Sequence, residues 1–395
     1  MQHHFGAAFV LMVFLSLIAP RSLAYLPLVF GTLLSLYFYA RCNARPCLPR
    51  AGSWIVSGLV GWILLSSLWA LDPATSLERA VKIGITLGGG LFWIALSRPI
   101  PRKWLQALVG LYIGAGLVLA VECYGQMPIS RFLLQMAEGE YLPRHSLNRG
   151  CVILSLLLAP ILALARNLWG DRKSACYGQA VIILSLFTGL SRCDSQTAQL
   201  AAIIGLILFY GTFLYRRWLW LFLSATIAVY CLSAPFAAIA LHDKMIGPAL
   251  ELPFLKAGNA APRMEIWNFV ALKALEKPWL GHGIEATRFM KADHWMKNMN
   301  ADTALHPHNA ALQAWVEFGF AGALALTAFL LFLLARCRAM AKPVAQRTAL
   351  ATLMAAFCVL NTGYGVWQGW QLGLIVLLFS LMAVIARQNA PVRYS

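Results

Sequence analysis

Charged residues are scarce in this sequence. Only 12% of its 395 residues are Asp, Glu, Lys or Arg, whereas 60% are hydrophobic and the mean hydropathy is +0.68. An average soluble domain has about 25% charged residues, and a folded chain of this size exposes too much surface to hide so much apolar area. The scarcity of charge excludes a soluble enzyme and a disordered chain, and it indicates an integral membrane protein.

Several familiar motifs are also missing. The nine cysteines are scattered and the longest polar stretch contains none, which excludes a disulfide framework. There is no Asp-x-Asp motif to hold a metal on a diphosphate, no Walker-type glycine loop, and no Ser-x-x-Lys or Gly-x-Ser-x-Gly nucleophile. We therefore expect no metal, nucleotide or other cofactor, and arginine would have to neutralise any phosphate group.

Long apolar runs recur along the chain. A helix of roughly 20 residues crosses a bilayer, and about 17 suffice when the flanking side chains reach the interface. The predicted fold is all-α: a polytopic membrane protein with one large, partly helical outer loop. The expected units are 1–238 with nine helices, 239–310 as the loop, and 311–395 with three helices and the tail. The twelve predicted spans are 5–20, 24–40, 53–70, 79–97, 105–122, 150–165, 175–190, 197–215, 218–238, 311–335, 348–363 and 370–386.

The basic residues indicate the orientation. Seventeen of the 32 Lys and Arg lie in the tail and in one alternating set of short connections, whereas the short connections of the opposite side hold seven. An excess of Lys and Arg in short loops marks the cytoplasmic side, so both termini are expected there. The net charge of +17 then reflects topology and contact with anionic lipid headgroups. No clustered basic domain suggests a nucleic-acid partner.

A helix is predicted inside the long loop. Pro262 suits its first turn, Pro278 ends it, and an apolar stripe that includes Trp267 recurs at helical spacing. This stripe would lie on the bilayer surface or cap the bundle. Arg263 is in the first turn, where the helix dipole disfavours a cation unless an anion shares the site. Arg263 therefore indicates a phosphate-binding corner, with a snorkelling arginine as the alternative.

Two histidines precede the tenth predicted span. Asn309 is a natural N-cap, which puts His308 at a helix N-terminus whose partial positive charge favours a neutral imidazole. A neutral histidine can act as a general base. The alternatives are an interfacial histidine and a metal pair with His306, although Pro307 is expected to turn the two side chains in different directions. Glu317, inside the span, is interpreted as hydrogen-bonded within the bundle.

Two further polar corners face the same side. Arg144 and Arg149 lie just before the sixth predicted span, and Arg192 lies between the seventh and the eighth, where Asp194 is an alternative partner for it. Three arginine-bearing corners and a neutral histidine on one face of a membrane protein predict a diphosphate site.

Three outer motifs occur together. They are His308-Asn309 with Leu312-Gln313, Glu317, Gly319 and Gly322; Arg263 and Trp267 with Pro278 and Gly281-x-Gly283; and Ser191-Arg192. In order and spacing they resemble the patterns of the O-antigen ligase/polymerase superfamily, although Cys193-Asp194 stands where small residues often follow Ser-Arg. With twelve spans and a large loop before the tenth, the likeness covers most of the chain.

The resemblance implies an inverting, metal-independent glycosyltransferase on the periplasmic face of a bacterial inner membrane. An O-antigen ligase moves O-antigen polysaccharide from undecaprenyl diphosphate to lipid A–core in lipopolysaccharide biosynthesis. His308 would be the catalytic base, while Arg263 and Arg192 would neutralise the diphosphate. The implied binding residues are Arg263, Arg192, Arg149, Arg144, Trp267, His306, Asn309 and Gln313.

Two other functions stay open at this point. An O-antigen polymerase would have two outer loops of comparable size, whereas 239–307 is more than twice as long as 123–149, which favours a ligase. A small-molecule transporter would need polar residues or broken helices at mid-membrane. Most predicted spans are cleanly apolar, and the polar residues of 361–371 are expected near a membrane face.

Overall fold

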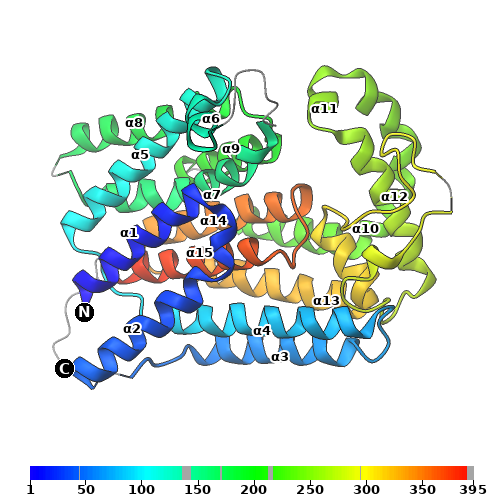
Figure 1. Cartoon of the computed structure of the whole chain (residues 1–395), viewed down its shortest axis with the longest axis horizontal. Helices are drawn as coiled ribbons and strands as arrows, with labels where there is room; N and C mark the ends of the chain where they lie inside the picture. The colour runs from blue at the N-terminus through cyan, green and yellow to red at the C-terminus, as the bar shows by residue number, and fades with distance from the viewer. Residues whose placement is uncertain (44, 136–143, 170, 212–216, 294, 389–395) are drawn as a thin grey trace.

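The computed structural model describes residues 1–395 apart from 44, 136–143, 170, 212–216, 294 and 389–395, and apart from the side chains of Arg144, Phe254 and Ala257. The regular structure of the described residues is helical, which confirms the all-α prediction (Figure 1). The α-helices are α1 (Gln2–Ile18), α2 (Leu26–Cys42), α3 (Arg50–Ser66), α4 (Pro73–Ala95), α5 (Arg102–Tyr124), α6 (Pro128–Leu133), α7 (Asn148–Ala165), α8 (Arg172–Leu190), α9 (Gln196–Tyr210), α10 (Arg217–Glu251), α11 (Pro253–Ala257), α12 (Ala260–Glu276), α13 (Ala310–Arg338), α14 (Pro343–Thr362) and α15 (Gly369–Gln388).

Each predicted span coincides with one of these helices. Among the described residues, seven helices are long and apolar enough to cross a membrane, namely α5, α7, α8, α10, α13, α14 and α15. Helices α1, α2, α3 and α9 are apolar but shorter. The chain is therefore a polytopic membrane protein, whereas the number of twelve spans stays a prediction.

Helix α7 forms the centre of the bundle. Every residue from Cys151 to Ala165 is buried, and the helix packs against α1, α5, α8, α9, α14 and α15. A helix that is apolar on all sides is stable where other helices surround it. This packing fixes the start of α7, which carries Arg149.

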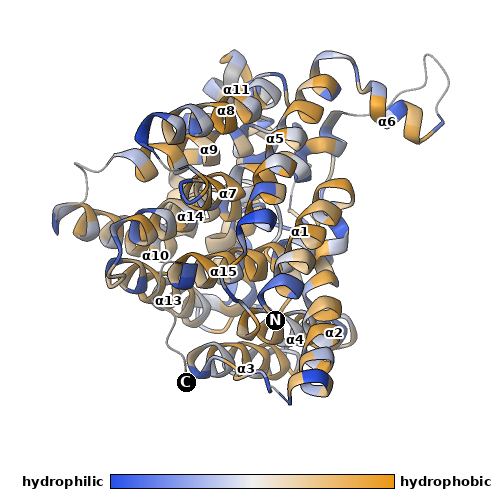
Figure 2. Ribbon diagram, turned by 90° about the vertical axis from the view of Figure 1, so that its left-hand side faces the viewer, coloured by the Kyte–Doolittle hydropathy of each residue, from blue (hydrophilic) through white to orange (hydrophobic). Residues whose placement is uncertain are grey.

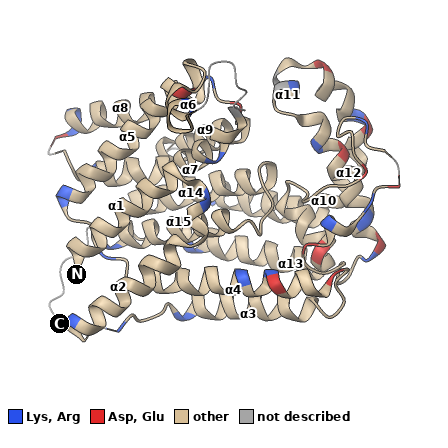
Figure 3. Cartoon of the chain, in the orientation of Figure 1, with Lys and Arg blue, Asp and Glu red and all other residues tan. Residues whose placement is uncertain are grey.

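Polar segments gather at one end of the bundle. In Figure 1 the N-terminus and the end of α15 lie at the left, whereas α11, α12 and the loop before α13 lie at the right. Figure 2 shows that the helices between these ends are mainly hydrophobic. Figure 3 shows Asp and Glu mostly around the right-hand end, together with Lys and Arg. Most groupings of Asp and Glu with Lys and Arg therefore lie at that end.

Two helix boundaries differ from the prediction by more than five residues. Helix α4 begins at Pro73 instead of residue 79, because the Asp72 side chain accepts hydrogen bonds from two backbone N–H groups of the first turn at 3.0 and 3.1 Å. Arg79 consequently lies within the helix. Helix α10 runs on to Glu251 instead of ending at 238, so the first part of the outer loop is helical.

The helix predicted inside the loop is confirmed as α12. It packs against α10 and α13 and buries Ile266, Phe269, Val270 and Ala274. Of the two expected positions for its apolar stripe, contact with the bundle is therefore the one observed. This packing places Arg263 and Trp267 beside the start of α13.

Candidate active site

The segment before α13 holds His308 in a left-handed backbone conformation, with φ of +55°. Asn309 caps α13 as predicted: its side-chain oxygen accepts from a backbone N–H of the first turn at 3.1 Å, and its amide donates to the Tyr230 hydroxyl at 2.8 Å. Trp267 of α12 donates its indole N–H to the carbonyl oxygen of Pro307 at 2.9 Å. Helices α10 and α12 therefore both hold the segment that carries His308.

The ring of His308 contacts the turn between α14 and α15. Its Nδ1 is hydrogen-bonded to the carbonyl oxygen of Gly363. A carbonyl only accepts, so Nδ1 carries the proton and the neutral ring has its lone pair on Nε2. Burial lowers the pKa of His308; the Gly363 carbonyl opposes this and the charge of Arg263 adds to it. The ring is therefore neutral near pH 7 as expected, but burial rather than the helix N-terminus is the main cause.

His306 lies directly beside His308, with ring centroids 4.3 Å apart and the planes at 45°. The expectation that Pro307 turns these side chains apart is wrong. A residue before proline is biased towards extended backbone, in which positions i and i+2 point to the same side. Burial lowers the pKa of His306 to about 4, with help from His308 and Arg288, and its Nε2 is buried without a hydrogen-bond partner. Within the described ranges, no third metal-ligating side chain joins the pair.

The charges of two arginines act on Tyr364, in the turn between α14 and α15. The guanidinium carbon of Arg149 lies 5.9 Å from the ring centroid of Tyr364. Burial raises the pKa of Tyr364, and the positive charges of Arg149 and Arg263 oppose this. Arg263 also acts on the pKa of His308. Tyr364, the two arginines and His308 therefore form one group.

The positive charges of this group are not neutralised by the described part of the protein. Neither Arg149 nor Arg263 forms an ion pair there. The Nε of Arg149 is buried without a hydrogen-bond partner, and burial lowers the pKa of Arg263. Partly desolvated cations of this kind are stabilised by a bound anion. The side chain of Arg144, the other arginine predicted at this corner, lies outside the described residues.

Arg192 occupies an exposed corner between α8 and α9. Its guanidinium carbon lies 5.4 Å from the ring centroid of Tyr124, and no ion pair links it to Asp194 in this part of the structure. Thr197, at the start of α9, hydrogen-bonds to the carbonyl oxygen of Thr362 at 3.2 Å. The corner of Arg192 therefore adjoins the turn between α14 and α15, but Arg192 itself points to Tyr124.

Glu317 is buried and hydrogen-bonded within the bundle, as predicted. It accepts from the side chain of Gln313 at 3.0 Å, from the indole of Trp367 at 2.5 Å and from the backbone N–H of Glu285 at 3.1 Å. Gln313 also accepts from the backbone N–H of Val366 at 3.0 Å. Gln313, predicted to bind substrate, thus ties α13 to the turn before α15 through its amide oxygen, whereas its NH₂ group bonds within α13.

Sequence reasoning missed this turn as part of the site. Gly363 orients His308, Tyr364 lies beside Arg149, and Trp367 donates to Glu317. The signal was present, because residues 361–368 place polar and aromatic side chains between two apolar runs.

Glycines join the outer loop to α13. Gly319 interrupts α13 with φ of +62° and ψ of −156°, a conformation that is essentially restricted to glycine. A Cβ on Gly319 would lie 2.3 Å from the carbonyl carbon of Trp279, and one on Gly281 would lie 2.4 Å from the α13 backbone. The backbone N–H groups of 282 and 283 donate to α13 carbonyls at 2.9 and 2.8 Å. The glycine pattern therefore allows two backbones to meet at the interruption.

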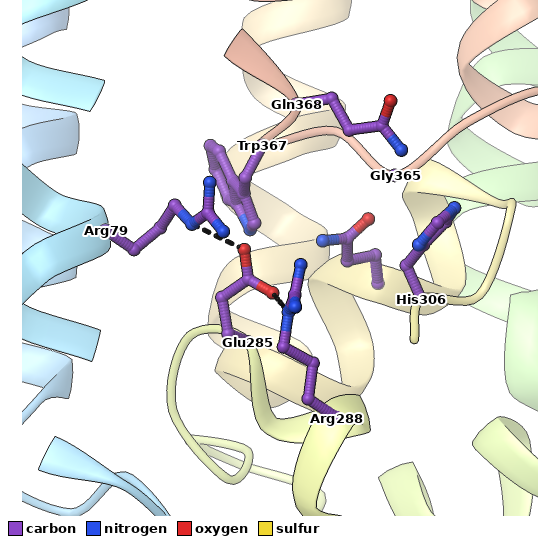
Figure 4. A pocket seen from close by; sticks show the side chains of 8 residues that line it. Arg79, Glu285, Arg288, His306, Gly365, Trp367 and Gln368 are labelled. Carbon is purple, nitrogen blue, oxygen red and sulfur yellow. Dashed lines mark hydrogen bonds and ion pairs between the residues drawn. The ribbon is translucent and has the colours of Figure 1, made fainter. Parts of the chain in front are cut away.

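A small polar pocket adjoins His306 (Figure 4). Glu285 lies between two arginines: the Nε of Arg79 is 2.7 Å from one carboxylate oxygen, and the Nε of Arg288 contacts the other. The ion pair with Arg79 connects α4 to the outer loop. The lining residues are Arg79, Glu285, Arg288, His306, Gln313, Gly365, Trp367 and Gln368.

Known proteins share the region that carries these residues. Residues 179–327, which include Arg192, Arg263 and His308, match the family model for O-antigen ligase. A "Putative polysaccharide ligase" of Rickettsia conorii is 24% identical over 348 residues, which is 87% of this chain and 82% of the relative. Relatives of the same name in Rickettsia felis and Rickettsia prowazekii are 25% and 27% identical, over 84% and 83% of this chain and 80% and 79% of their own length. These matches show that the chain is similar to O-antigen ligases over residues 179–327 and to proteins named polysaccharide ligases over most of its length.

Proposed function

We propose that this protein moves O-antigen polysaccharide from undecaprenyl diphosphate to lipid A–core, with inversion at the transferred sugar. The observation that supports this most is the group formed by Arg149, Arg263, Tyr364 and His308, which combines unneutralised arginines with a neutral histidine. Such a group contains a binding site for a leaving diphosphate and a base for the attacking hydroxyl.

Arg263 and Arg149 are the proposed diphosphate ligands. A planar guanidinium meets two phosphate oxygens at once, and both groups lie in a partly buried site where their charge counts for more than in water. They stabilise the negative charge that develops on the leaving diphosphate, which is usually the largest catalytic contribution. The sequence has no Asp-x-Asp motif, so the proposed transfer needs no divalent metal. Arg192, at the adjoining corner, would attract the diphosphate from the side of α9.

His308 is the proposed general base. Its Nε2 lone pair takes the proton of an acceptor hydroxyl while the hydroxyl oxygen bonds to the anomeric carbon. The bond from that carbon to the diphosphate breaks on the opposite face and its electron pair leaves with the diphosphate, which inverts the linkage. His308 then releases the proton to solvent. Trp267 and Asn309 act by holding the backbone of His308 rather than by touching substrate.

The proposed location is a bacterial inner membrane with the site on the periplasmic side and both termini in the cytoplasm. Support comes from the unequal distribution of Lys and Arg between the two sets of connections. The outer loop also lies at the opposite end of the bundle from the N-terminus (Figure 1). The undecaprenyl chain would then lie among the helices while the sugars stay in water.

Reconstitution tests this proposal. Purified protein in detergent is mixed with undecaprenyl-diphosphate-linked glycan and lipid A–core, without nucleotide or added metal, and the products are separated on a gel. A ladder of glycan attached to lipid A–core is the expected result. Elongation of the donor glycan in the absence of lipid A–core would instead identify a polymerase. No product with either substrate set would refute a transferase.

A further inference from the structure

The pocket beside His306 presents hydrogen-bond donors that the protein leaves free. Arg79 and Arg288 each use Nε to bind Glu285, and no described residue accepts from their terminal guanidinium nitrogens. Gln368 accepts an indole N–H at 2.7 Å with its oxygen, which leaves its NH₂ group free. A pocket lined by free hydrogen-bond donors is complementary to a ligand rich in acceptors, such as a phosphate or a carboxylate.

The exposed fractions of the charged side chains also indicate that the pocket binds an anion. The side chain of Glu285 is only 7% exposed, whereas those of Arg79 and Arg288 are 24% and 37% exposed. The carboxylate is therefore the buried part of this cluster. In Figure 4 the guanidinium groups flank Glu285 and His306 lies across the pocket. The pocket thus offers positive charge to a ligand, and Arg288 is the more accessible of the two arginines.

The position of the pocket relative to the proposed base suggests which substrate enters it. His306 and Arg288 both line the pocket. The imidazole of His308 lies beside that of His306 with ring centroids 4.3 Å apart, and the charge of Arg263 acts on His308. Of the histidine pair, His306 therefore faces the pocket, whereas His308 and Arg263 are not among the residues that line it. In an inverting transfer the leaving group and the attacking hydroxyl lie on opposite faces of the anomeric carbon. With the diphosphate on the side of Arg263, the acceptor approaches from the side of His306.

We propose that this pocket is an acceptor subsite, which binds a phosphate or carboxylate substituent of the acceptor glycan close to the hydroxyl that reacts. Arg288 is the main ligand of this anion, and Arg79, Gln368 and His306 surround it. The assignment to the acceptor rests on the proposed function, because it uses the diphosphate as the reference point. An anionic sugar of the donor glycan has the same chemistry and is distinguished by the experiment below.

Initial rates of the full-length purified protein test the subsite, with one substrate saturating and the other varied. The acceptors are lipid A–core as isolated, its phosphatase-treated form and its carboxyl-methylated form. A hydrogen bond to a charged group contributes about 1.5–3 kcal/mol, so Arg288→Gln is expected to raise the KM of the intact acceptor about tenfold or more. The kcat and the donor KM should change little. Removing the recognised anion should raise the wild-type KM similarly, after which Arg288→Gln has no further effect.

Two further variants guard against a folding defect. Arg288→Gln leaves the buried Glu285 with one partner fewer, so its melting temperature is measured first. Gln368→Ala breaks no ion pair and should raise the acceptor KM by a smaller factor. Lys291→Gln is the matched control, because Lys291 is a 77% exposed cation of the same loop outside the pocket, and it should leave both KM values unchanged.

Three results would overturn the subsite: a lower kcat with an unchanged acceptor KM, an equal rise in KM for intact and anion-free acceptors, or a rise confined to the donor KM. Equilibrium binding of labelled lipid A–core in mixed micelles separates this inference from the proposed function. Arg288-dependent binding without any transfer would refute the transferase and keep the subsite. Absence of both binding and transfer would refute both.

Discussion

Replacing His308 with asparagine removes the proposed base with little change to its surroundings. Asparagine is one of the few residues that readily adopt the left-handed conformation seen here, with φ of +55°. Its side-chain NH₂ can still donate to the carbonyl oxygen of Gly363, as Nδ1 of the imidazole does. The amide cannot take a proton from a hydroxyl. His308→Asn therefore separates the position of the side chain from its chemistry.

The expected loss is in the chemical step. General base catalysis contributes about 10²–10⁴-fold, which corresponds to about 2.7–5.5 kcal/mol of barrier. Retaining the hydrogen bond to Gly363 should keep the loss of folding free energy within about 1 kcal/mol. Donor affinity should stay near wild type, because Arg149 and Arg263 are unchanged. Binding and turnover should thus separate in this variant.

The pH dependence supplies a second readout. Burial lowers the pKa of His308 below its ordinary value of 6.5. The neutral, reactive ring then persists below pH 6.5, and activity is lost only as the pH falls through the lowered pKa. In wild-type protein the acid limb of kcat/KM is therefore expected below pH 6.5. The residual activity of His308→Asn should lack this limb.

Single-turnover transfer, donor binding and melting temperature are measured for wild type, His308→Asn and a control. His242→Asn is the matched control, because His242 lies in the last third of α10 and its one hydrogen bond within the described residues is to its neighbour Asp243, at 2.7 Å. It should transfer at the wild-type rate. If His308→Asn kept a rate within threefold of wild type, or kept the acid limb, His308 would not be the base.

Three further expectations concern the arginines, metals and the interruption of α13. Arg263→Ala should nearly abolish transfer while the protein stays folded. Arg263→Lys should recover little activity, because an ammonium group cannot bind two phosphate oxygens at once as a guanidinium does. Substantial activity of the Lys variant in the transfer assay would contradict bidentate binding. Transfer should persist in EDTA, since arginine supplies the charge, and a loss reversed by Mg²⁺ or Mn²⁺ would refute this. Gly319→Ala should markedly lower the melting temperature, because its Cβ would lie 2.3 Å from the carbonyl carbon of Trp279. Gly110→Ala is the control and should not lower it, because a Cβ at position 110 would have no neighbouring atom within 4 Å. Equal melting temperatures of the two variants would show that the interruption of α13 tolerates a side chain.

The fold followed from the sequence where hydropathy alone decides it. Each predicted apolar run coincides with a helix, because a backbone in lipid must satisfy its hydrogen bonds internally. The boundaries failed where other interactions decide. The start of α4 depends on the Asp72 cap, and α10 continues to Glu251 beyond its apolar run.

The site was predicted in part. The sequence singled out His308, Asn309 and Arg263, and the structure places them around one segment. It missed Tyr364 and Gly363, because their contacts with Arg149 and His308 join residues far apart in the chain. The contact between the rings of His306 and His308 was also missed, since Pro307 was expected to turn the two side chains in different directions.

The sequence by itself determined that this is a helical membrane protein with its chemistry-bearing residues outside the apolar runs. Composition and the order of motifs are local properties, and the bilayer imposes helices on apolar runs without reference to their neighbours. Only the tertiary structure decided which residues meet. The neutral state of His308 comes mainly from burial, and the ion pair of Arg79 with Glu285 depends on α4 packing beside the outer loop. Burial and contacts between distant segments are properties of the packed bundle, and no stretch of sequence specifies them alone.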